Sequence, residues 1–412
     1  MNDAARLHYD GLETRDPATR ERDMLAELPS QVAHAKANTQ YFAILLAGVD
    51  PRDVNSRAAL AALPVTRKST LIELQKANPP FGGLNATPIG RLARIFVSPG
   101  PIYDAEGRDS DFWGTARALF AAGFRAGDVV HNTFSYHFSP AASMFETGAH
   151  ALGCAVVPAG TGQTEMQIAA IEQLKPQGYV GTPSFLKILM ERAEETGADI
   201  SSLKRAIVSG EPLFPAVREF LSSRHVETYQ SYGTADLGTL AYESVAREGL
   251  ILSENLIVEI LKPGTGDPVA AGEVGEVVVT TFNRDYPLIR FATGDLSSVL
   301  PGVSPCGRTN TRIKGWQGRA DQTTKVRGLF VHPQQVAEII KRHVGIVRAR
   351  LVVTHAEGAD AMTLLCETAN SLDIDAVANT AREVTKLRAD VRAVNVGSLP
   401  NDGRVIEDQR KL

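Results

Sequence analysis

The chain has 412 residues, which is too long for one ordinary hydrophobic core, so we expect two or more domains. Hydrophobic residues make up 43% and charged residues 22% of the sequence, proportions that are typical of a soluble globular enzyme. The net charge is −4 with acidic and basic residues interspersed, which argues against nucleic acid or an anionic membrane as a partner.

Cysteine usage and the N-terminal segment both favour a cytoplasmic location. Cys154, Cys306 and Cys366 are widely spaced and form neither a CxxC motif nor a dense disulfide framework. Residues 1–23 are polar and charged, unlike a signal peptide. No stretch approaches the roughly 20 apolar residues that a membrane span requires.

Strand and helix signals alternate along residues 95–224, which predicts a parallel sheet flanked by helices. Residues 17–47 show helical spacing, and shorter helical pieces follow within 57–76. The expected strands are Ile95–Val97 and strands within 127–136, 154–160, 178–183 and 203–212. The expected helices are Phe112–Ala122, Ala141–Leu152, 164–174, 184–197 and 214–224.

The pattern changes after about residue 229, where residues 256–282 alternate with period two between Gly and Pro turns, as β-hairpins do. The last segment predicts helices at Gln334–His343 and Asp375–Lys386 and strands at Ala349–His355, Met362–Glu367 and Val391–Val396. We therefore predict an α/β protein with a large N-terminal α/β body that carries a β-rich subdomain (residues 1–317) and a small α+β C-terminal lid domain (residues 318–412).

Four loop segments are richer in Gly and polar residues than a connection requires: VSGEPL (208–213), YQSYGTADLG (229–238), YPLIRFATGDLSS (286–298) and GRADQTTKVRGLFVHP (318–333). Each follows or interrupts an apolar run. We expect each at a strand end, where α/β folds place ligands.

In this order and spacing, and together with GTGQTEMQI (160–168) and GTPSFLKIL (181–189), these segments resemble the phenylacetate–coenzyme A ligase family of the adenylate-forming superfamily. The resemblance extends from about residue 90 to the C-terminus. It implies an ATP-dependent ligase that forms an acyl-adenylate and then a thioester with coenzyme A, after rotation of the lid. It further implies a small carboxylic acid as partner, ATP or AMP, Mg²⁺ and coenzyme A as ligands, and a homodimer.

The resemblance assigns nucleotide roles to several residues. Tyr232 would stack on adenine, next to Gly233, and Thr234 would donate to the α-phosphate. Asp236 stands where relatives usually carry a Glu that binds Mg²⁺, and an Asp can also bind this ion. The same residues would also fit a Gly-Thr turn with a helix-capping Asp.

The resemblance also places further residues around the nucleotide. Asp295 would accept the ribose hydroxyls, although an Asx turn would use the same residue. The ribose also involves Arg319 by resemblance. The segment that lines adenine is Ser209, Gly210, Glu211 and Pro212. Asp321 matches the hinge of the lid, and loop placement suits a hinge.

Two regions are candidates for the other substrates. Lys325, Arg327 and Gly328 resemble the lid stretch near coenzyme A, although exposed basic residues are commonly only solvated. Tyr136, His137 and Phe138 resemble residues near the carboxylate, with a half-buried core histidine as the alternative for His137. Nothing in the sequence identifies the acid.

Residues 98–107, which follow the strand Ile95–Val97, stand where the family has a phosphate-binding loop, and they depart from the family pattern. Ser98 and Gly100 remain, but the threonines and the lysine that grip the β- and γ-phosphates are absent, and prolines lack N–H donors. We expect weaker handling of pyrophosphate, or a cation supplied elsewhere, with Arg108 as one candidate.

The C-terminal tail also departs, because the family lysine that serves adenylation is missing. Arg404 is nearest to its place and keeps the charge but not the point geometry. Lys411 is an alternative. Catalysis is therefore assigned to Thr234, Asp236 and Arg404.

The positions that match a zinc site in many relatives are Ser244, Ile251, Ser304 and Cys306. Only one of these is a ligand type that zinc prefers, so we expect no zinc.

Two other hypotheses compete with the ligase. The first is a catalytically impaired protein that binds a nucleotide or acyl-adenylate and acts in regulation. The second is an enzyme that uses only the thioester half of the cycle or a different acceptor.

Overall fold

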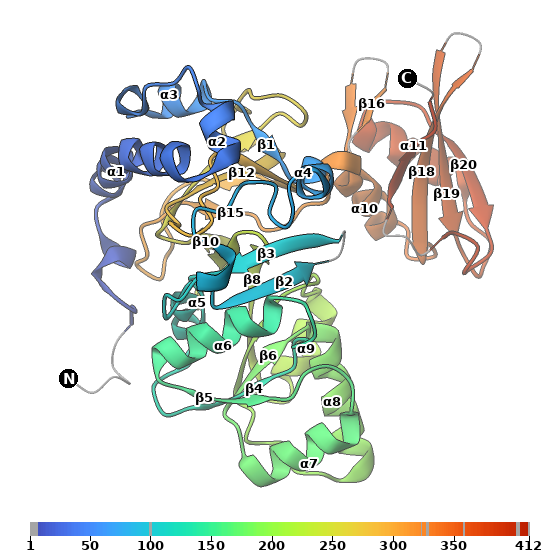
Figure 1. The fold of residues 1–412 in the computed structure, drawn as a ribbon. Helices are drawn as coiled ribbons and strands as arrows, with labels where there is room; N and C mark the ends of the chain where they lie inside the picture. Colours follow the sequence, from blue (N-terminus) through green and yellow to red (C-terminus); the bar gives the residue numbers. More distant parts are fainter. Residues whose placement is uncertain are drawn as a thin grey trace.

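The alternating segment in the middle of the chain builds most of a nine-stranded sheet with the order β14-β15-β10-β9-β8-β7-β6-β4-β5 (Figure 1). The computed structural model describes residues 7–98, 101–322, 324–326, 329–356, 359–400 and 404–410. Strands β8, β7, β6, β4 and β5 are parallel, which confirms the predicted sheet. These strands are β4 (Val129–Asn132), β5 (Ala155–Pro158), β6 (Gly178–Gly181), β7 (Arg205–Val208) and β8 (Glu227–Thr234).

The helices that cover the parallel strands follow the predicted spacing. They are α5 (Ala116–Ala121), α6 (Ala141–Leu152), α7 (Thr164–Leu174), α8 (Pro183–Thr196) and α9 (Pro215–Ser222). The prediction was wrong at α5, which was expected to begin at Phe112. The carboxylate of Asp111 instead accepts hydrogen bonds from the backbone N–H groups of Thr115 and Ala116 at 2.8 and 3.2 Å, so the helix starts only after this cap.

Strand β8 takes part in two kinds of pairing. Its first half, Glu227 to Gln230, pairs in parallel with β7, and its second half, from Ser231, pairs antiparallel with β9 (Gly238–Tyr242). The antiparallel part of the sheet continues through β10 (Leu250–Leu252), β15 (Arg312–Ile313) and β14 (Val299–Leu300). The carboxyl end of β8 therefore lies where the parallel sheet changes into the antiparallel one.

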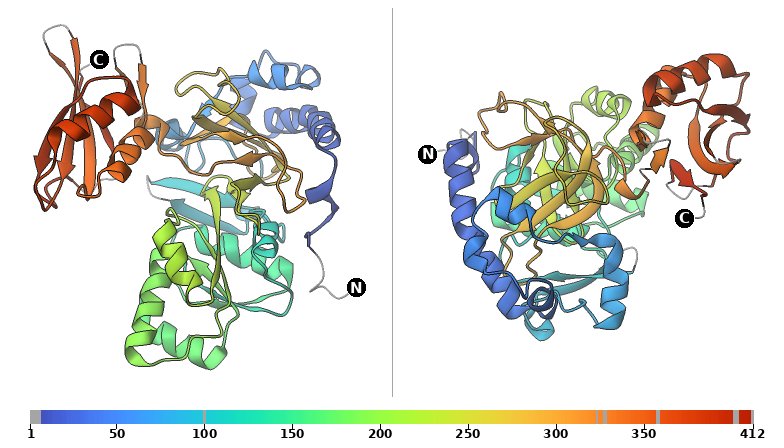
Figure 2. Two further views of the ribbon diagram at one scale, coloured as in Figure 1. Left: turned by 180° about the vertical axis from the view of Figure 1, so that it is seen from behind. Right: turned by 90° about the horizontal axis from the view of Figure 1, so that it is seen from above.

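The β-rich subdomain is a second sheet of four strands in the order β1-β13-β12-β11. Its strands are β1 (Thr66–Arg67), β11 (Leu256–Leu261), β12 (Gly275–Thr281) and β13 (Phe291–Ser297). Strands β11 and β12 form the predicted antiparallel hairpin, whereas β13, which was not predicted, pairs antiparallel with β12 and in parallel with β1. The N-terminal helices α1 (Pro17–Asn38), α2 (Gln40–Leu45), α3 (Arg57–Ala61) and α4 (Leu71–Ala77) lie near this sheet (Figures 1 and 2).

The run at Ile95–Val97 forms a hairpin of its own and not a strand of the main sheet. Strand β2 (Arg94–Ser98) pairs antiparallel with β3 (Ile102–Glu106), which the sequence analysis did not predict. The connection between them spans only residues 99–101, of which Pro99 and Gly100 lie outside the described residues.

The C-terminal segment folds around a four-stranded sheet with the order β20-β19-β18-β21. Its elements are β16 (Thr324–Val326), β17 (Leu329–Val331), α10 (Pro333–Arg342), β18 (Arg348–Ala356), β19 (Ala359–Glu367), α11 (Ile374–Thr385), β20 (Asp390–Val394) and β21 (Ile406–Asp408). The apolar side chains of α10, α11 and this sheet share one core, and the segment stands to one side of the body in all views (Figures 1 and 2). The overall fold class is thus confirmed, and residue 318 as the domain boundary stays a prediction.

None of the described helices combines the length and the apolar character that crossing a lipid bilayer would require.

Buried ion pairs connect the N-terminal arm, residues 7–38, to the rest of the large N-terminal domain. Arg20, which is 3% exposed, donates from Nε to the carboxylate of Glu254 at 2.9 Å, and Glu254 is also only 3% exposed. Asn310 and Arg15 donate to the same carboxylate. Removing one member of such a pair leaves a charge without compensation in the protein interior.

We therefore predict that Arg20→Ala lowers the free energy of unfolding by ~3 kcal/mol, because it leaves Glu254 buried without its main partner. Urea unfolding followed by circular dichroism measures this change. Arg52→Ala is the matched control, since Arg52 pairs with Asp50 at the surface, and should leave stability nearly unchanged. Equal effects of the two substitutions would contradict the prediction.

Candidate functional site

Asp295 joins three parts of the chain that are far apart in sequence. From β13, its Oδ2 accepts a hydrogen bond from the Tyr232 hydroxyl at 2.9 Å. Its Oδ1 accepts from Trp316 Nε1 at 3.1 Å and from Arg319 Nη1 at 3.2 Å. Three donors around one carboxylate fix its direction. The structure therefore brings together Tyr232, Asp295 and Arg319, as the sequence analysis expected.

Local backbone geometry makes this arrangement possible. Gly294 has a φ of +77°, and a Cβ there would lie 2.8 Å from Arg319 Nη2, so only glycine lets the guanidinium approach. Asp295 and Arg319 also form an antiparallel backbone bridge. Burial, and then the charge of Asp295, raise the pKa of Tyr232 well above its ordinary value, so this phenol stays a neutral donor.

Trp316 is a site residue that the sequence analysis missed. Its indole N–H donates to Asp295 while half of its surface is exposed. The sequence signal that could have identified it is a tryptophan two positions before the GRAD motif, since an indole N–H usually finds a hydrogen-bond acceptor.

The predicted adenine segment follows β7. The Ser209 hydroxyl donates to the backbone oxygen of Ser231 at 3.0 Å, which ties this segment to β8 one residue before Tyr232. Glu211 accepts from the backbone N–H of Ser184 at 2.7 Å, and Gly210, Glu211 and Pro212 are exposed. The segment thus lines the carboxyl end of the parallel strands, beside Tyr232.

The Gly233–Asp236 turn presents a different chemistry. A Cβ at Gly233 would lie 2.4 Å from the backbone oxygen of Gly238, so the turn has no room for a side chain there. Thr234 Oγ1 has no hydrogen-bond partner among the described residues, and neither has Asp236 Oδ1. The other oxygen of Asp236, Oδ2, accepts from Lys68 Nζ at 2.5 Å.

Lys68 and Asp104 are two more residues that the sequence analysis did not single out. Lys68 begins the 3-10 helix η4 (Lys68–Thr70) directly after β1, and Asp104 lies in the middle of β3. Asp104 is 1% exposed, and neither of its carboxylate oxygens has a hydrogen-bond partner in the described part of the chain. Burial, followed by the charge of Asp236, raises the pKa of Asp104 to about 8.

This cluster has the donor set that Mg²⁺ requires. The oxygens without partners belong to carboxylates and to a hydroxyl, and Mg²⁺ is commonly held by one or two carboxylates together with substrate phosphates. Within the described ranges no three His, Cys, Asp or Glu side chains converge, so water and ligand oxygens would complete the shell. Asp236 therefore fits the metal role expected for it.

The suggestion that Arg108 replaces the phosphate-loop lysine is not supported. Its guanidinium donates to the backbone oxygens of Arg91 and Leu92 at 3.0 and 3.2 Å, which uses it to hold the neighbouring turn. Ser98 is 5% exposed and donates to the oxygen of Ile102 at 3.3 Å. A cation that does contact the Asp236 turn is Lys68, which precedes Ser98 by about 30 residues in the chain.

The candidate substrate loop, residues 136–138, lies beside the hairpin of β2 and β3. The backbone N–H of Val97 in β2 donates to the oxygen of Phe138 at 3.0 Å, and Tyr136, His137 and Phe138 are all exposed. Phe138 has a φ of +62°, a strained value for a bulky residue that is common at functional sites. The exposure of His137 excludes the alternative of a half-buried core histidine.

Some of the predicted lid residues lie in the part of the chain that the structure describes, and others lie outside it. The backbone of Asp321 lies in the 3-10 helix η6 (Ala320–Gln322), and that of Lys325 in β16. Arg327, Gly328 and Lys411 lie outside the described residues. Arg404 is exposed and comes two residues before β21, an edge strand that pairs in parallel with β18.

Three of the four positions considered for zinc contain polar side chains near one another. Ser304 Oγ lies 3.1 Å from Cys306 Sγ, and Arg308 Nη1 donates to the same sulfur at 3.6 Å. Ile251 is buried in the hydrophobic core. The absence of zinc stays a prediction.

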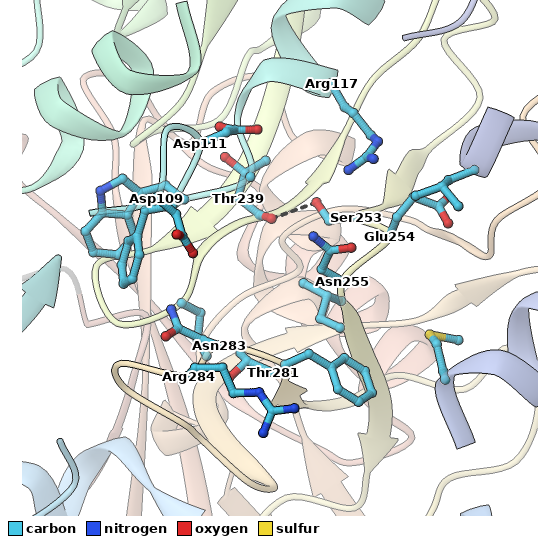
Figure 3. A pocket seen from close by; sticks show the side chains of 18 of the residues that line it. Asp109, Asp111, Arg117, Thr239, Ser253, Glu254, Asn255, Thr281, Asn283 and Arg284 are labelled. Atoms are coloured by element: carbon cyan, nitrogen blue, oxygen red, sulfur yellow. Dashed lines mark hydrogen bonds between the residues drawn. The ribbon is translucent and has the colours of Figure 1, made fainter. Parts of the chain in front are cut away.

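A polar cavity of about 460 Å³ lies between the N-terminal arm and the body. Figure 3 shows Asp109, Arg117, Asn255 and Arg284 around it. Asp236 and Tyr286 also belong to its wall, so the cavity reaches the Asp236 turn from the side of the N-terminal arm.

Comparisons with known proteins identify relatives that cover most of the chain. A family model described as AMP-binding enzyme matches residues 111–283. A phenylacetate-coenzyme A ligase of Aromatoleum evansii is 33% identical over 361 residues, which cover 83% of this chain and 80% of that protein. A second one, of Thermus thermophilus, is 31% identical and covers 79% and 76%. Among solved structures, an open conformation of 2-hydroxyisobutyryl-CoA ligase has a TM-score of 0.85 at 23% identity and covers 99% of this chain and 96% of that one.

We predict that Asp295→Ala abolishes measurable binding of AMP without unfolding the chain, because it removes the acceptor on which Tyr232, Trp316 and Arg319 converge. Isothermal titration calorimetry with AMP measures the loss, and circular dichroism checks the fold. Trp316→Phe is the matched control, since it removes one donor and keeps the carboxylate, and should weaken binding by only about tenfold. Unchanged AMP affinity in Asp295→Ala would remove Asp295 from the nucleotide site.

A second prediction concerns the buried carboxyl of Asp104 in the presence of a chelator. Because its folded-state pKa is about 8 against an ordinary 3.8, the folded chain binds more protons than the unfolded chain between these values. This group therefore makes the free energy of unfolding fall as the pH rises from 4 to 8. Asp104→Asn should remove that dependence and be the more stable chain at pH 8. Parallel pH–stability curves would contradict this.

Proposed function

The chain belongs to the phenylacetate–coenzyme A ligase family of AMP-binding enzymes, and on that premise we propose that it is an ATP-dependent carboxylate–CoA ligase. In the first half-reaction, a carboxylate oxygen attacks the α-phosphorus of ATP and pyrophosphate leaves. In the second, the thiolate of coenzyme A attacks the acyl carbon and AMP leaves. The observation that carries the proposal is the convergence of Tyr232, Trp316 and Arg319 on Asp295.

The nucleotide would occupy the carboxyl end of β8. The segment Ser209–Pro212 and Tyr232 supply the walls for adenine, and Asp295 with Arg319 supplies an acceptor and a donor for the ribose. Both carboxylate oxygens of Asp295 already have donors, so the ribose hydroxyls would share or replace them. Thr234 Oγ1, which has no partner in the described structure, is available to donate to the α-phosphate.

Negative charge on the phosphates is the main electrostatic problem for such a reaction. Lys68 is a cation next to Asp236, and we propose that it supplies part of the charge that the short loop after β2 lacks. Asp236 is the residue that would hold Mg²⁺, and this ion, when bound, offsets phosphate charge.

The C-terminal segment 318–412 would act as the lid. Asp321 is proposed as the hinge, Arg404 as the cation near the carboxylate and α-phosphate, and Lys325, Arg327 and Gly328 as neighbours of coenzyme A. The exposed loop of Tyr136, His137 and Phe138 is proposed to contact the acid. A homodimer remains an expectation from the family resemblance.

The regulatory alternative, a nucleotide-binding protein without turnover, has no supporting observation. The relatives carry ligase names, and the site contains an acceptor, donors and a cation.

The proposal is tested by isotope exchange between pyrophosphate and ATP in the presence of a panel of carboxylic acids. Exchange that depends on one acid, followed by formation of its CoA thioester in mass spectrometry, is the expected result. Binding of AMP without any acid-dependent exchange would overturn the adenylation half and leave only the thioester half-reaction.

We predict that Arg404→Ala slows adenylation by ~100-fold, the effect of losing one charged group at a transition state. The thioester step, measured with supplied acyl-adenylate, should change far less, because the proposed rotation of the lid before that step would carry Arg404 away from the α-phosphate. Arg404→Lys is the control and should keep most of the rate. If Arg404→Ala adenylates as fast as the wild type, Arg404 has no part in the reaction.

A further inference from the structure

Four separate segments bring their polar side chains to one buried place next to the Gly233–Asp236 turn. Asp236 follows β8, Lys68 follows β1, Asp104 comes from β3, and Tyr286 comes from the loop before β13. Gln75 of α4 fixes β3 there, because its side-chain amide accepts from and donates to the backbone of Tyr103 at 2.8 and 2.9 Å. The position of Asp104 is therefore set by the fold.

The hydrogen bonds in this cluster are incomplete. Two oxygens of Asp104, one of Asp236 and the Tyr286 hydroxyl have no partner with hydrogen-bond geometry among the described residues. Ser98 is a polar neighbour of Asp104, and Gln75 is a polar neighbour of Tyr286. The exposed fractions of Asp104, Asp236 and Tyr286 are 1%, 7% and 3%, so bulk water does not reach most of their surface. Buried polar atoms without partners are rare and indicate a group that the protein chain itself does not provide.

The charges in the cluster are also unequal. Two carboxylates face one ammonium, and Lys68 contacts only Oδ2 of Asp236. A buried negative charge without compensation is costly, and it must be neutralised by a proton or by a cation. Burial and the two carboxylate charges raise the pKa of Tyr286 well above its ordinary value, which agrees with a hydroxyl that lies close to both acids.

We propose that Asp104 and Asp236 together bind one divalent cation, Mg²⁺ or Mn²⁺, before any nucleotide is present. The available ligands are oxygen atoms only, which suits these hard cations and excludes a soft metal. Asp236 Oδ1 and the Asp104 carboxylate would be its protein ligands, while Lys68 keeps its contact with Asp236 Oδ2. Two carboxylates would hold the ion, and water would complete its shell until phosphate oxygens replace it.

The catalytic meaning of this site rests on the proposed function, whereas cation binding itself does not. In a ligase, a cation bound in advance would supply charge where the loop after β2 has lost its lysine. Asp104 is then a second carboxylate ligand that the sequence motifs do not contain.

The test is titration of the metal-free protein with Mn²⁺ in the absence of nucleotide, followed by electron paramagnetic resonance of free Mn²⁺. The wild type should bind one Mn²⁺, and Asp104→Asn should bind it about tenfold more weakly or worse, the range that loss of a metal-site partner produces. Asp109→Asn, which removes an exposed carboxylate five residues later, should keep the wild-type affinity. An equal loss in both variants would show that general negative potential attracts the ion, and it would overturn the site.

A third variant separates metal binding from damage to the fold. Lys68→Met removes the ammonium that competes for Asp236, so Mn²⁺ should bind more tightly than in the wild type. A destabilised chain would not gain affinity. No Mn²⁺ binding by the wild type would overturn the proposal even if the chain is an active ligase, and Mn²⁺ binding by a chain without exchange activity would overturn only the proposed function.

Discussion

The whole site depends on one strand, β8, which pairs in parallel with β7 and antiparallel with β9. The pairing changes between Gln230 and Ser231, so Tyr232 and Thr234 lie beyond the end of the parallel sheet. The half of β8 that pairs with β9 carries both residues past the carboxyl end of the parallel sheet, where Asp295 of the second sheet accepts a hydrogen bond from Tyr232.

Asp295 then couples the body to the segment that leads into the C-terminal domain. Trp316 and Arg319 both donate to it, and they lie directly before η6 and β16. Under the proposed function, a ligand that displaces these two donors from Asp295 would act directly on the segment that leads into the C-terminal domain.

The turn after β8 has a different electrostatic character from the Asp295 region. At Asp295, donors outnumber acceptors, whereas at Asp236 and Asp104 the oxygens outnumber the donors. Under the proposed function, ribose hydroxyls would therefore share or replace the donors at Asp295, whereas the Asp236 region would take a cation and the phosphates that follow it. Lys68 pairs with one carboxylate oxygen of Asp236 and leaves the other without a partner among the described residues.

The sequence by itself determined the alternation of strands and helices, the small C-terminal domain, and the identity of the motif residues, because each of these is written in local periodicity or in a contiguous motif. Helices α6 and α7 begin and end where the spacing of apolar residues predicts, with Gly153 closing α6 in the left-handed region. Only the tertiary structure decided that β2 and β3 form a hairpin apart from the main sheet, that Arg108 binds backbone oxygens, and that Lys68, Asp104 and Trp316 belong to the site. Lys68 and Asp236 are 168 positions apart, and no local pattern encodes which distant charges become neighbours. That choice arises from the packing of four segments against one another, which brings Asp104 and Asp236 into the same low-dielectric space and gives their charges their effect.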